Sequence, residues 1–429
     1  MAADGAVRGA VDAAWRNDSA RLVASVARIV RDVGLAEELA QDALVAALEH
    51  WPRDGIPDNP AAWLMTVARR RAFDRRRHAG IAAASHDAIG QDLQALGADL
   101  TPDVVDTLVA AEADPVGDDL LRLIFTACHP VLSTDARVAL TLKLLCGLGT
   151  GEIARACLVS EPAMAQRIVR AKRTLSTARV PYELPPREEL GPRLASVLEV
   201  VYLVFNEGYA ATRGEDWLRP ALCDEAIRLG RLLAELAPAE PEAYGLLALM
   251  ELQASRTAAR TGPEGDPILL ADQNRSRWDR VAIERGLDAL AHAERLLGDH
   301  GPGPYALQAA IAACHARAPT APDTDWRRIV RLYDALAQLT GSPVVELNRA
   351  VAIGMADGPA AALPIVERLA AHPAMARYHW LPSVEGDLLE KLGRREEARR
   401  AYDRAADLAG NAREKALLRS RSQAMREHP

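Results

Sequence analysis

The chain has 429 residues, of which 49% are hydrophobic and 4% aromatic, and its formal net charge is −7. This length predicts two or three domains, and a composition dominated by Ala, Leu and Arg favours an all-α protein over a sheet-rich one. The cysteines are scattered along the chain, at Cys128, Cys146, Cys157, Cys223 and Cys314. This spacing argues against a disulfide framework and a zinc site, so we expect no metal and no cofactor. There is no signal-peptide pattern and no apolar run of transmembrane length, which predicts a cytoplasmic protein without a membrane partner.

Residues 7–33 and 35–51 have the spacing of amphipathic helices. The first has apolar positions at Leu22, Val26, Ile29, Val30 and Val33. In the second, the expected core-facing stripe is Leu35, Leu39, Ala43, Ala46 or Ala47, and Leu48. The opposite side carries Glu37, Glu38, Gln41 and Asp42. This acidic face either balances a neighbouring basic helix or docks a basic partner, and the residues alone leave both open.

A strongly basic helix is predicted after a loop at residues 52–60. Asn59 and Pro60 indicate a turn followed by a helix start. Trp63 and Val67 recur at helical spacing, and a neighbouring apolar stripe contains Leu64, Ala68 and Ala72. The remaining surface has one acid, Asp74, against six arginines, which are Arg69, Arg70, Arg71, Arg75, Arg76 and Arg77. A solvated charged face is the alternative, but the absence of Glu–Arg pairs at i,i+4 favours binding of a polyanion.

The acidic helix with AEELAQDAL, the Pro-containing loop and the segment WL-x-x-VARRRAFDRRR resemble region 2 of the sigma-70 family of RNA polymerase sigma factors, in particular the extracytoplasmic-function (ECF) group. The resemblance implies that the acidic helix docks on the β′ subunit of core RNA polymerase through Glu37, Glu38, Gln41 and Asp42. It also implies that the loop and the basic helix capture the melted −10 promoter element, through Asn59, Trp63, Arg69, Arg70, Arg71, Arg75, Arg76 and Arg77. Such a reader needs cations and a pocket for an unstacked base. Arg70 stands where family members commonly carry Asn, so the preferred base there is open.

Residues 79–118 form a predicted acidic, flexible linker. Between Ala79 and Leu121 there is no Lys or Arg, but there are nine acidic residues, interspersed with Gly, Ala and Pro. Composition alone indicates a disordered linker. The resemblance implies, in addition, that this segment runs through basic nucleic-acid channels of the polymerase, where an acidic chain can mimic a strand.

Residues 119–179 are predicted to form a second compact helical domain of the helix-turn-helix type. Two short helices have apolar positions at Leu120, Leu123, Ile124, Ala127, Leu132, Val138, Leu140, Leu144 and Leu145. A break at residues 147–149 precedes the third helix, and a turn at Val159 and Ser160 precedes the fourth. In the fourth helix we expect a buried stripe of Met164, Ile168, Ala171 and Leu175. The outward side chains Gln166, Arg167, Arg170 and Arg173 suit a major groove, where Arg reads guanine and Gln reads adenine.

After a region-2-like domain and an acidic linker, this helix-turn-helix domain resembles sigma region 4, which reads the −35 element. The resemblance implies −35 contacts from Ser160, Ala163, Gln166, Arg167, Arg170, Lys172 and Arg173. It also implies the partners, which are promoter DNA and the β′ and β subunits of core RNA polymerase. The alternative is a non-sigma helix-turn-helix regulator with a protein-interaction scaffold. A plain repressor, however, needs neither an acidic docking helix nor a helix that reads single strands.

The remainder is predicted to be a Pro-rich linker at residues 180–192 and an α-helical repeat domain at residues 193–427. Its expected helices are 193–209, 216–236, 241–259, 278–297, 305–316, 326–339, 344–355, 378–392 and 394–408. The last pair fits the tetratricopeptide pattern at Gly386, Leu389, Gly393, Ala398, Tyr402 and Ala405. Residues 206–229 and 267–278 resemble the C-terminal extension of an ECF subgroup, which implies that the extension regulates the sigma domains through a protein partner or an intramolecular contact.

Two polar clusters in this C-terminal part raise the question of catalysis. They are Asn206, Glu207, Asp216 and Asp224, and Asp272, Gln273 and Asn274. Neither is accompanied by a nucleophile–base pair, a Gly-rich phosphate loop or a metal-ligand spacing. We therefore interpret them as helix caps and inter-repeat hydrogen bonds, and expect the protein not to be an enzyme.

Overall fold

The computed structural model describes residues 2–87, 116–157, 159–210, 218–262, 267–298 and 301–427. In these ranges the secondary structure is helical, and the β pairing is limited to an isolated bridge between Thr261 and Pro267. The prediction of an all-α protein is thus confirmed. The chain forms two compact units, Met1–Val200 and Val201–Pro429. Within the described ranges, no helix has both the length and the apolarity needed to cross a membrane.

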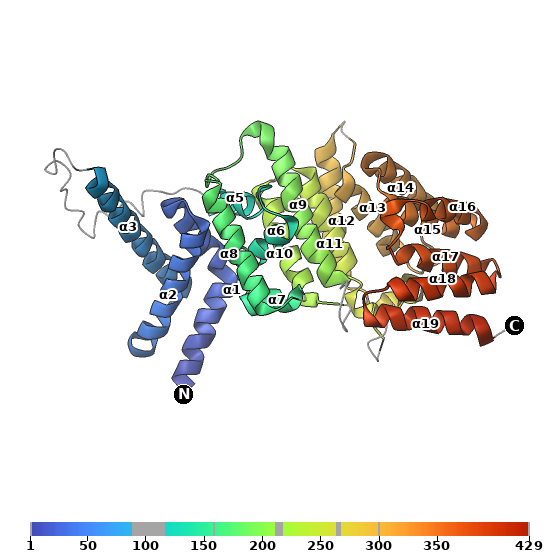
Figure 1. Ribbon diagram of the computed structural model, residues 1–429, viewed down its shortest axis with the longest axis horizontal. Coiled ribbons are helices and arrows are strands. Elements are labelled where there is room, and N and C mark those ends of the chain that lie inside the picture. The colour runs from blue at the N-terminus through green and yellow to red at the C-terminus, as the bar shows by residue number, and fades with distance from the viewer. Residues whose placement is uncertain are drawn as a thin grey trace. The chain divides into compact units, whose positions relative to one another are not determined.

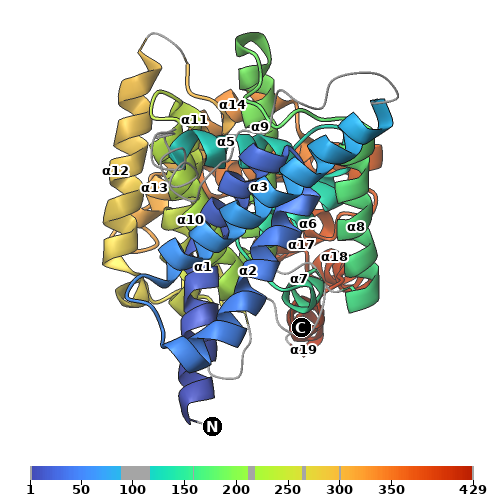
Figure 2. The same cartoon turned by 90° about the vertical axis from the view of Figure 1, so that its left-hand side faces the viewer.

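The first unit begins with three helices that pack on one another (Figure 2): α1 (Ala2–Val30), α2 (Val33–Asp54) and α3 (Pro60–Asp87). Asp32 starts α2, because its carboxylate accepts a hydrogen bond from the Leu35 backbone N–H at 2.9 Å. Small side chains line the contact, with Ala36, Ala43 and Ala72 fully buried, so the helix axes can approach closely. The helix α3 continues to Asp87, beyond residue 79, where the acidic linker was predicted to begin. Residues 88–115 of the predicted acidic linker lie outside the described residues.

One part of the predicted core stripe of α2 is wrong. Leu48 is 42% exposed, whereas Trp51 is 2% exposed. The buried stripe runs instead through Ala43, Ala46 and Ala47 to Trp51, as a period of 3.6 residues requires. The Trp51 ring lies edge-on to Trp63 of α3, at 5.5 Å between centroids, so an aromatic pair closes this end of the contact between α2 and α3.

The first unit continues with the helix-turn-helix domain, formed by α5 (Val116–Ala127), α6 (Thr134–Leu144), α7 (Thr150–Ala156) and α8 (Glu161–Thr177). Ser133 caps α6 and Ser160 caps α8, each accepting a hydrogen bond from the backbone N–H three residues later. The predicted buried stripe of the fourth helix is confirmed, since Met164, Ile168, Ala171 and Leu175 are the buried residues of α8.

The segment predicted as a linker at residues 180–192 is partly structured. Helix α9 (Arg187–Tyr209) begins inside it and includes Pro192, and the Tyr182 side chain is buried. The prolines suggested a break, but Pro186 stands before the first helical turn, where proline is compatible with a helix start. Glu188 and Glu189 lie in that first turn, where their carboxylates interact favourably with the positive end of the helix dipole.

The second unit is a succession of helices in which each packs on the next (Figure 1), an arrangement typical of helical repeats. Its helices after α9 are α10 (Pro220–Leu236), α11 (Pro241–Ala254), α12 (Arg280–Leu297), α13 (Pro304–Arg317), α14 (Trp326–Thr340), α15 (Pro343–Asp357), α16 (Pro359–Ala370), α17 (Trp380–Lys391), α18 (Arg395–Leu408) and α19 (Ala412–Glu427). Short 3₁₀ turns lie at Thr257–Ala259, Leu270–Asp272, Arg275–Arg277 and Pro373–Met375. Helices α16 and α19 were not predicted from the sequence. Pro359 and Pro364 interrupt the helical pattern of α16. For α19 the signal that could have been used was Asn411, which is buried and caps the helix by accepting a hydrogen bond from the Arg413 N–H at 2.9 Å.

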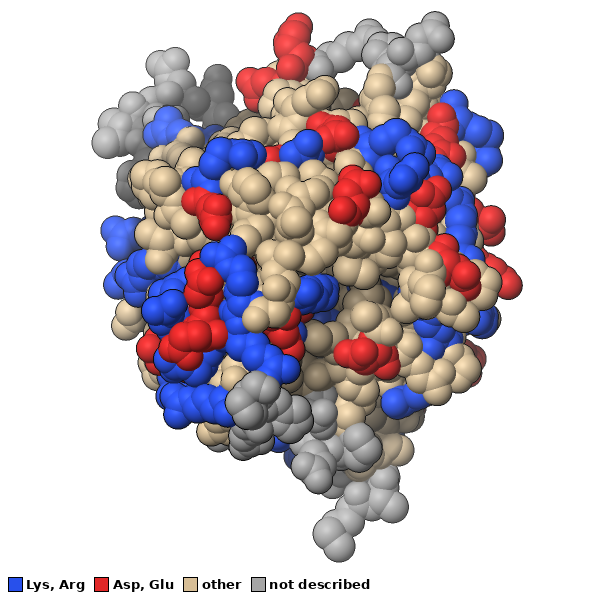
Figure 3. Space-filling view, turned by 90° about the vertical axis from the view of Figure 1, so that its right-hand side faces the viewer, with Lys and Arg blue, Asp and Glu red and all other residues tan. Residues whose placement is uncertain are grey.

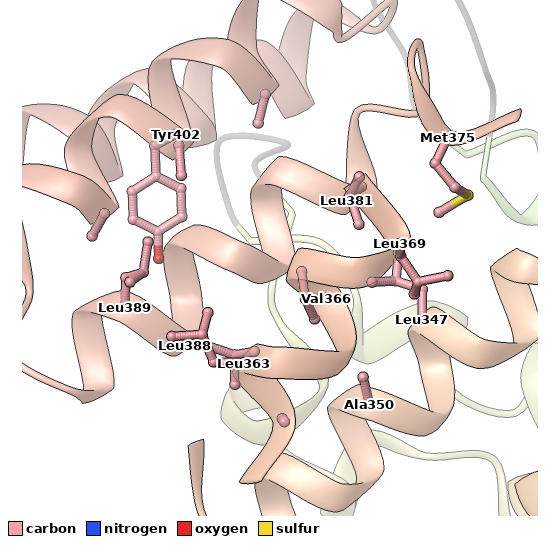
Figure 4. Packing of buried hydrophobic residues seen from close by; sticks show 14 of the residues in the cluster. Leu347, Ala350, Leu363, Val366, Leu369, Met375, Leu381, Leu388, Leu389 and Tyr402 are labelled. Carbon is pink, nitrogen blue, oxygen red and sulfur yellow. The ribbon is translucent and has the colours of Figure 1, made fainter. Parts of the chain in front are cut away.

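Four of the predicted tetratricopeptide positions of α17 and α18 belong to one core, in which Figure 4 labels Leu389 and Tyr402; they are Leu389, Ala398, Tyr402 and Ala405. Tyr402 is fully buried, and a Cβ atom on Gly386 would lie 2.7 Å from its ring. Gly386 therefore allows the two helices to approach. Gly393, with φ +73°, forms the turn between them. The small and aromatic residues of the pattern are thus used as the tetratricopeptide interpretation requires.

Candidate nucleic-acid and polymerase interface

The four residues of α2 that were predicted to dock on the polymerase differ in their exposure. Glu38, Gln41 and Asp42 are exposed. Glu37 is 2% exposed, and its carboxylate forms ion pairs with Lys172 and, at 3.4 Å, with Lys143. The placement of Glu37 on the exposed face was therefore wrong, because the residue follows the buried Ala36 on the edge of the core stripe.

The basic helix α3 divides its arginines between the protein and the solvent. Arg69 donates a hydrogen bond from Nε to Ser25 Oγ at 2.7 Å, and Arg71 lies 3.8 Å from Asp42. Arg77 pairs with Asp74 at 3.2 Å. Arg70, Arg75 and Arg76 are exposed and form no ion pair with any described residue, a conclusion limited to that part of the chain. These three, with Arg77, make the positive surface of the helix.

The loop before α3 borders a cavity of about 200 Å³. Asn59 is one of its lining residues and also caps α3, accepting a hydrogen bond from the Ala62 N–H at 3.1 Å. From α1, the cavity is lined by Trp15, Asp18 and Ser19 among others. Trp63, predicted to contact DNA, is half-buried against Trp51. The structure thus brings Asn59 to a hollow and directs Trp63 mainly into the protein.

On α8, the outward face predicted from helical spacing is solvent-accessible. Ser160, Ala163, Gln166, Arg170 and Arg173 are exposed. Arg167 is half-buried and lies 3.4 Å from Asp135, and Lys172 faces Glu37. Arg170 and Arg173 also line an open hollow of about 460 Å³. Five of the seven predicted −35 contacts therefore share one open face, while two are engaged within the unit.

The polar clusters of the second unit act mainly as structural groups. Asn274 caps the 3₁₀ turn that follows it, through the Ser276 N–H at 3.0 Å. Gln273 donates to the Ile268 carbonyl at 3.1 Å, and Glu207 pairs with Arg219. Asp216 lies outside the described residues. The interpretation of Asn274 as a cap is confirmed.

The surface over the last helices is of mixed charge. Figure 3 shows Lys and Arg side chains intermingled with Asp and Glu on this face. Many of them pair, as in Arg394–Glu397 at 2.7 Å and Arg404–Glu385 at 2.7 Å. This face therefore lacks the single-sign field that attracts a polyanion, in contrast to α3.

A basic helix beside an acidic helix, followed by a helix-turn-helix domain, defines a DNA-binding transcription factor. Residues 17–80 match the family model "Sigma-70 region 2", residues 122–175 match "Sigma-70, region 4", and residues 193–294 match "Family of unknown function (DUF6596)". The chain is 30% identical over 159 residues to "ECF RNA polymerase sigma factor SigK" of Mycobacterium ulcerans (strain Agy99), covering 36% of this chain and 78% of that protein. It belongs to the ECF group of the sigma-70 family, whose members are not enzymes.

Similarity over the whole chain is also found. "Uncharacterized protein R00370" of Rhizobium meliloti (strain 1021) is 44% identical over 412 residues, which covers 96% of this chain and 95% of that protein. The matched region covers most of both units of this chain. The solved structure "Crystal Structure of the Yeast Tom70" aligns with a TM-score of 0.36 at 11% identity, covering 98% of this chain and 86% of that one.

A single substitution on α8 tests base reading. We expect Arg170→Ala to weaken binding to a −35 element by about 1–3 kcal/mol and to relax the preference at one base pair, because a bidentate Arg–guanine contact would be lost. The measurement is competition binding with −35 variants. Arg280→Ala, which removes an exposed arginine from the second unit, is the matched control. A uniform loss on all sequences would show that Arg170 contacts only the backbone.

Proposed function

We propose that this protein is an alternative sigma factor that acts in the cytoplasm, binds core RNA polymerase and directs initiation at promoters defined by −10 and −35 elements. The observation that carries the proposal is the order of two different DNA-reading surfaces in one chain. The exposed arginines of α3 form one, and the open face of α8 forms the other. A regulator that binds only duplex DNA needs the second surface alone.

The chemistry of the first surface suits melted DNA. The phosphates of a single strand are attracted to Arg70, Arg75 and Arg76, and an unstacked base needs a hollow next to that path. The cavity beside Asn59 supplies such a hollow. We therefore assign −10 recognition to the α2–α3 loop together with α3. Trp63 contributes by fixing the start of α3 against Trp51.

Docking on the polymerase is assigned to the exposed acids of α2. Glu38 and Asp42, together with Gln41, form a polar face without a basic side chain of its own, and a surface of this kind attracts a basic partner. We propose the β′ subunit as this partner for α2 and the β subunit as a further contact of the complex.

The test is run-off transcription with purified core polymerase and the full-length chain. We expect transcripts from promoters that core enzyme alone ignores, together with a stable complex of the chain and core. A chain that binds duplex DNA but forms no complex with core and yields no transcript would instead be a non-sigma regulator.

We further propose that the second unit modulates this activity, through a protein partner or an intramolecular contact. The division between the units falls inside α9, after Val200. The first turns of α9 bind the helix-turn-helix domain, since Arg193 donates to the Phe125 carbonyl at 2.8 Å. A truncation after Val200 therefore keeps these contacts, unlike one after residue 179. We expect its transcriptional output to differ from that of the full-length chain at equal protein concentration, and equal output would contradict the modulating role.

A further inference from the structure

Three arginines of the second unit gather around two aromatic rings. The Arg256 guanidinium lies over the Tyr209 ring and over the Trp278 ring, at 5.8 Å from each centroid. Arg260 lies over the Tyr209 ring at 3.5 Å, and Arg275 lies over the Trp278 ring at 4.8 Å. Both rings share Arg256, so the three cations form one connected group. We call these three arginines, with Tyr209 and Trp278, the arginine cluster.

Neutral groups hold the guanidinium groups of the arginine cluster in place. Arg275 donates from Nη1 to two backbone carbonyls, those of His315 and Ala318, at 2.6 Å each. Arg256 donates from Nη2 to the Tyr209 hydroxyl at 2.7 Å. Ring faces and carbonyl oxygens orient a guanidinium group, but they carry no full negative charge. These contacts therefore fix the geometry of the cluster without neutralising it.

Arginines elsewhere in the same unit have a carboxylate partner. Arg285 binds Glu251, and hydrogen bonding to this carboxylate raises the pKa of Arg285. In the arginine cluster, by contrast, burial and then the charge of Arg256 lower the pKa of Arg275, and burial lowers the pKa of Arg260 to about 10. Among the described residues, neither Arg256 nor Arg275 forms an ion pair. A buried cation in such surroundings is stabilised by an anion that binds to it.

Two buried donors of the cluster have no acceptor in the described part of the chain. They are Arg275 Nε and Trp278 Nε1, and these residues are 9% and 4% exposed. Arg256 is half-buried, and its one side-chain hydrogen bond within the described ranges leaves most of its five N–H donors for a ligand. Burial, with the charges of Arg256 and Arg275, lowers the pKa of His315 to about 4, so this neighbour is neutral at physiological pH. The cluster thus offers donors and positive charge, and Arg256 is its solvent-accessible member.

We propose that the arginine cluster is a binding site for a phosphate group, carried by a free phosphate ion or by a phosphate monoester. Arg binds phosphate oxygens through two parallel N–H donors, and a dianion compensates several cations better than a monocarboxylate does. The inference concerns the second unit alone and does not depend on the sigma function. It adds a small-molecule ligand to the protein partner or intramolecular contact proposed for this unit.

The first measurement is hydrogen exchange of the full-length chain in phosphate and in chloride at equal ionic strength. We expect exchange in residues 256–262 and 267–278 to slow about tenfold when phosphate is at ten times its dissociation constant, because a ligand stabilises the state that binds it by RT ln(1 + [L]/Kd). Phosphate can also bind the exposed arginines of α3 and α8. Protection confined to those helices would overturn the proposal.

The second measurement compares variants by the phosphate concentration that half-protects this segment. Arg256→Gln should weaken phosphate binding about tenfold or more, because charge-assisted hydrogen bonds are lost. Arg256→Lys keeps the charge without the planar fork and should give an intermediate affinity. The matched control is Arg277→Gln, which removes an exposed arginine from the same segment and should leave the affinity unchanged.

Equal affinities in Arg256→Gln and Arg277→Gln would overturn the site. If Arg256→Gln loses protection of the segment already in chloride, Arg256→Lys decides, and wild-type affinity in that variant would overturn the proposal. Titration with AMP, a phosphate monoester, distinguishes the two sources of the phosphate group: tighter binding of AMP than of phosphate supports a phosphorylated metabolite, and binding of phosphate alone supports the free ion. Protection by neither, or equal protection by acetate, would overturn the assignment to phosphate.

Discussion

Replacing Tyr402 by Ala is expected to cost about 3–5 kcal/mol in the stability of the C-terminal helices, the usual range for removing a buried aromatic side chain. Its ring is fully buried and fills the space that Gly386 leaves open. The Arg421 guanidinium lies over the ring at 4.6 Å, and the hydroxyl donates to Glu390 Oε2 at 2.6 Å. The mutation therefore removes the packing of the ring (Figure 4), a cation–π contact and a hydrogen bond together.

Hydrogen exchange of the full-length chain is the suitable measurement, because a chain of two units does not unfold in a single two-state transition. Protection should fall in α17 and α18 and remain in α1, α2 and α3. Tyr402→Phe is the matched control: it keeps the ring and loses only the hydroxyl, at about 1 kcal/mol. Equal loss of protection in both variants would mean that the hydrogen bond, and not the ring, holds this pair together.

The sequence predicted most helices because their signals are local. In α8 a capping serine, an early proline and four apolar residues at helical spacing were sufficient, and the buried stripe is as expected. The prolines of α16 and of the start of α9 led to wrong predictions. From sequence alone a proline indicates the end of a helix, whether it stands before a helix or within one. The contact of Gly386 with Tyr402 shows the favourable case, where a repeat pattern encodes a packing relation across two helices.

The site was predictable only where exposure follows from spacing within one helix. Glu38 and Asp42 on α2, and Arg170 on α8, needed no information about distant residues. The burial of Glu37 could not be predicted in this way, because it depends on Lys143 and Lys172, which are more than 100 positions further along the chain. Trp15, Lys143 and Tyr182 were not singled out at all. Tyr182 stands in a Pro-rich segment that was predicted to be a linker, so its burial was not expected.

The distribution of charge separates reading surfaces from structural ones. Glu251, 2% exposed, binds the half-exposed Arg231 and Arg285, and such pairs in the second unit fix one helix against another. Arg70, Arg75 and Arg76 have no such partner within the described part of the chain. Exposed arginines that form no such ion pair are available to bind an anionic ligand. Substituting these three arginines is therefore the most direct test of the −10 assignment.

The triple substitution Arg70→Gln, Arg75→Gln and Arg76→Gln is expected to abolish most open-complex formation while leaving the fold intact, because Gln keeps a high helix propensity. Taking about 1 kcal/mol for each exposed charge-assisted contact, affinity for a single-stranded −10 oligonucleotide should fall about a hundredfold. The salt dependence carries the stronger signature. Each phosphate contact contributes about −0.7 to the slope of log K against log salt for single strands, so the slope should become shallower by about 2.

The matched control is Arg327→Gln, Arg328→Gln and Arg331→Gln, which removes the same charge from exposed positions of α14 (Trp326–Thr340) in the second unit. It changes the net charge of the protein equally, so it measures the contribution of the overall field, which should be small at physiological ionic strength because distant charges are screened. An unchanged slope in the α3 variant, or equal slopes in both variants, would show that these arginines do not contact the strand, and −10 recognition would then have to be sought away from α3.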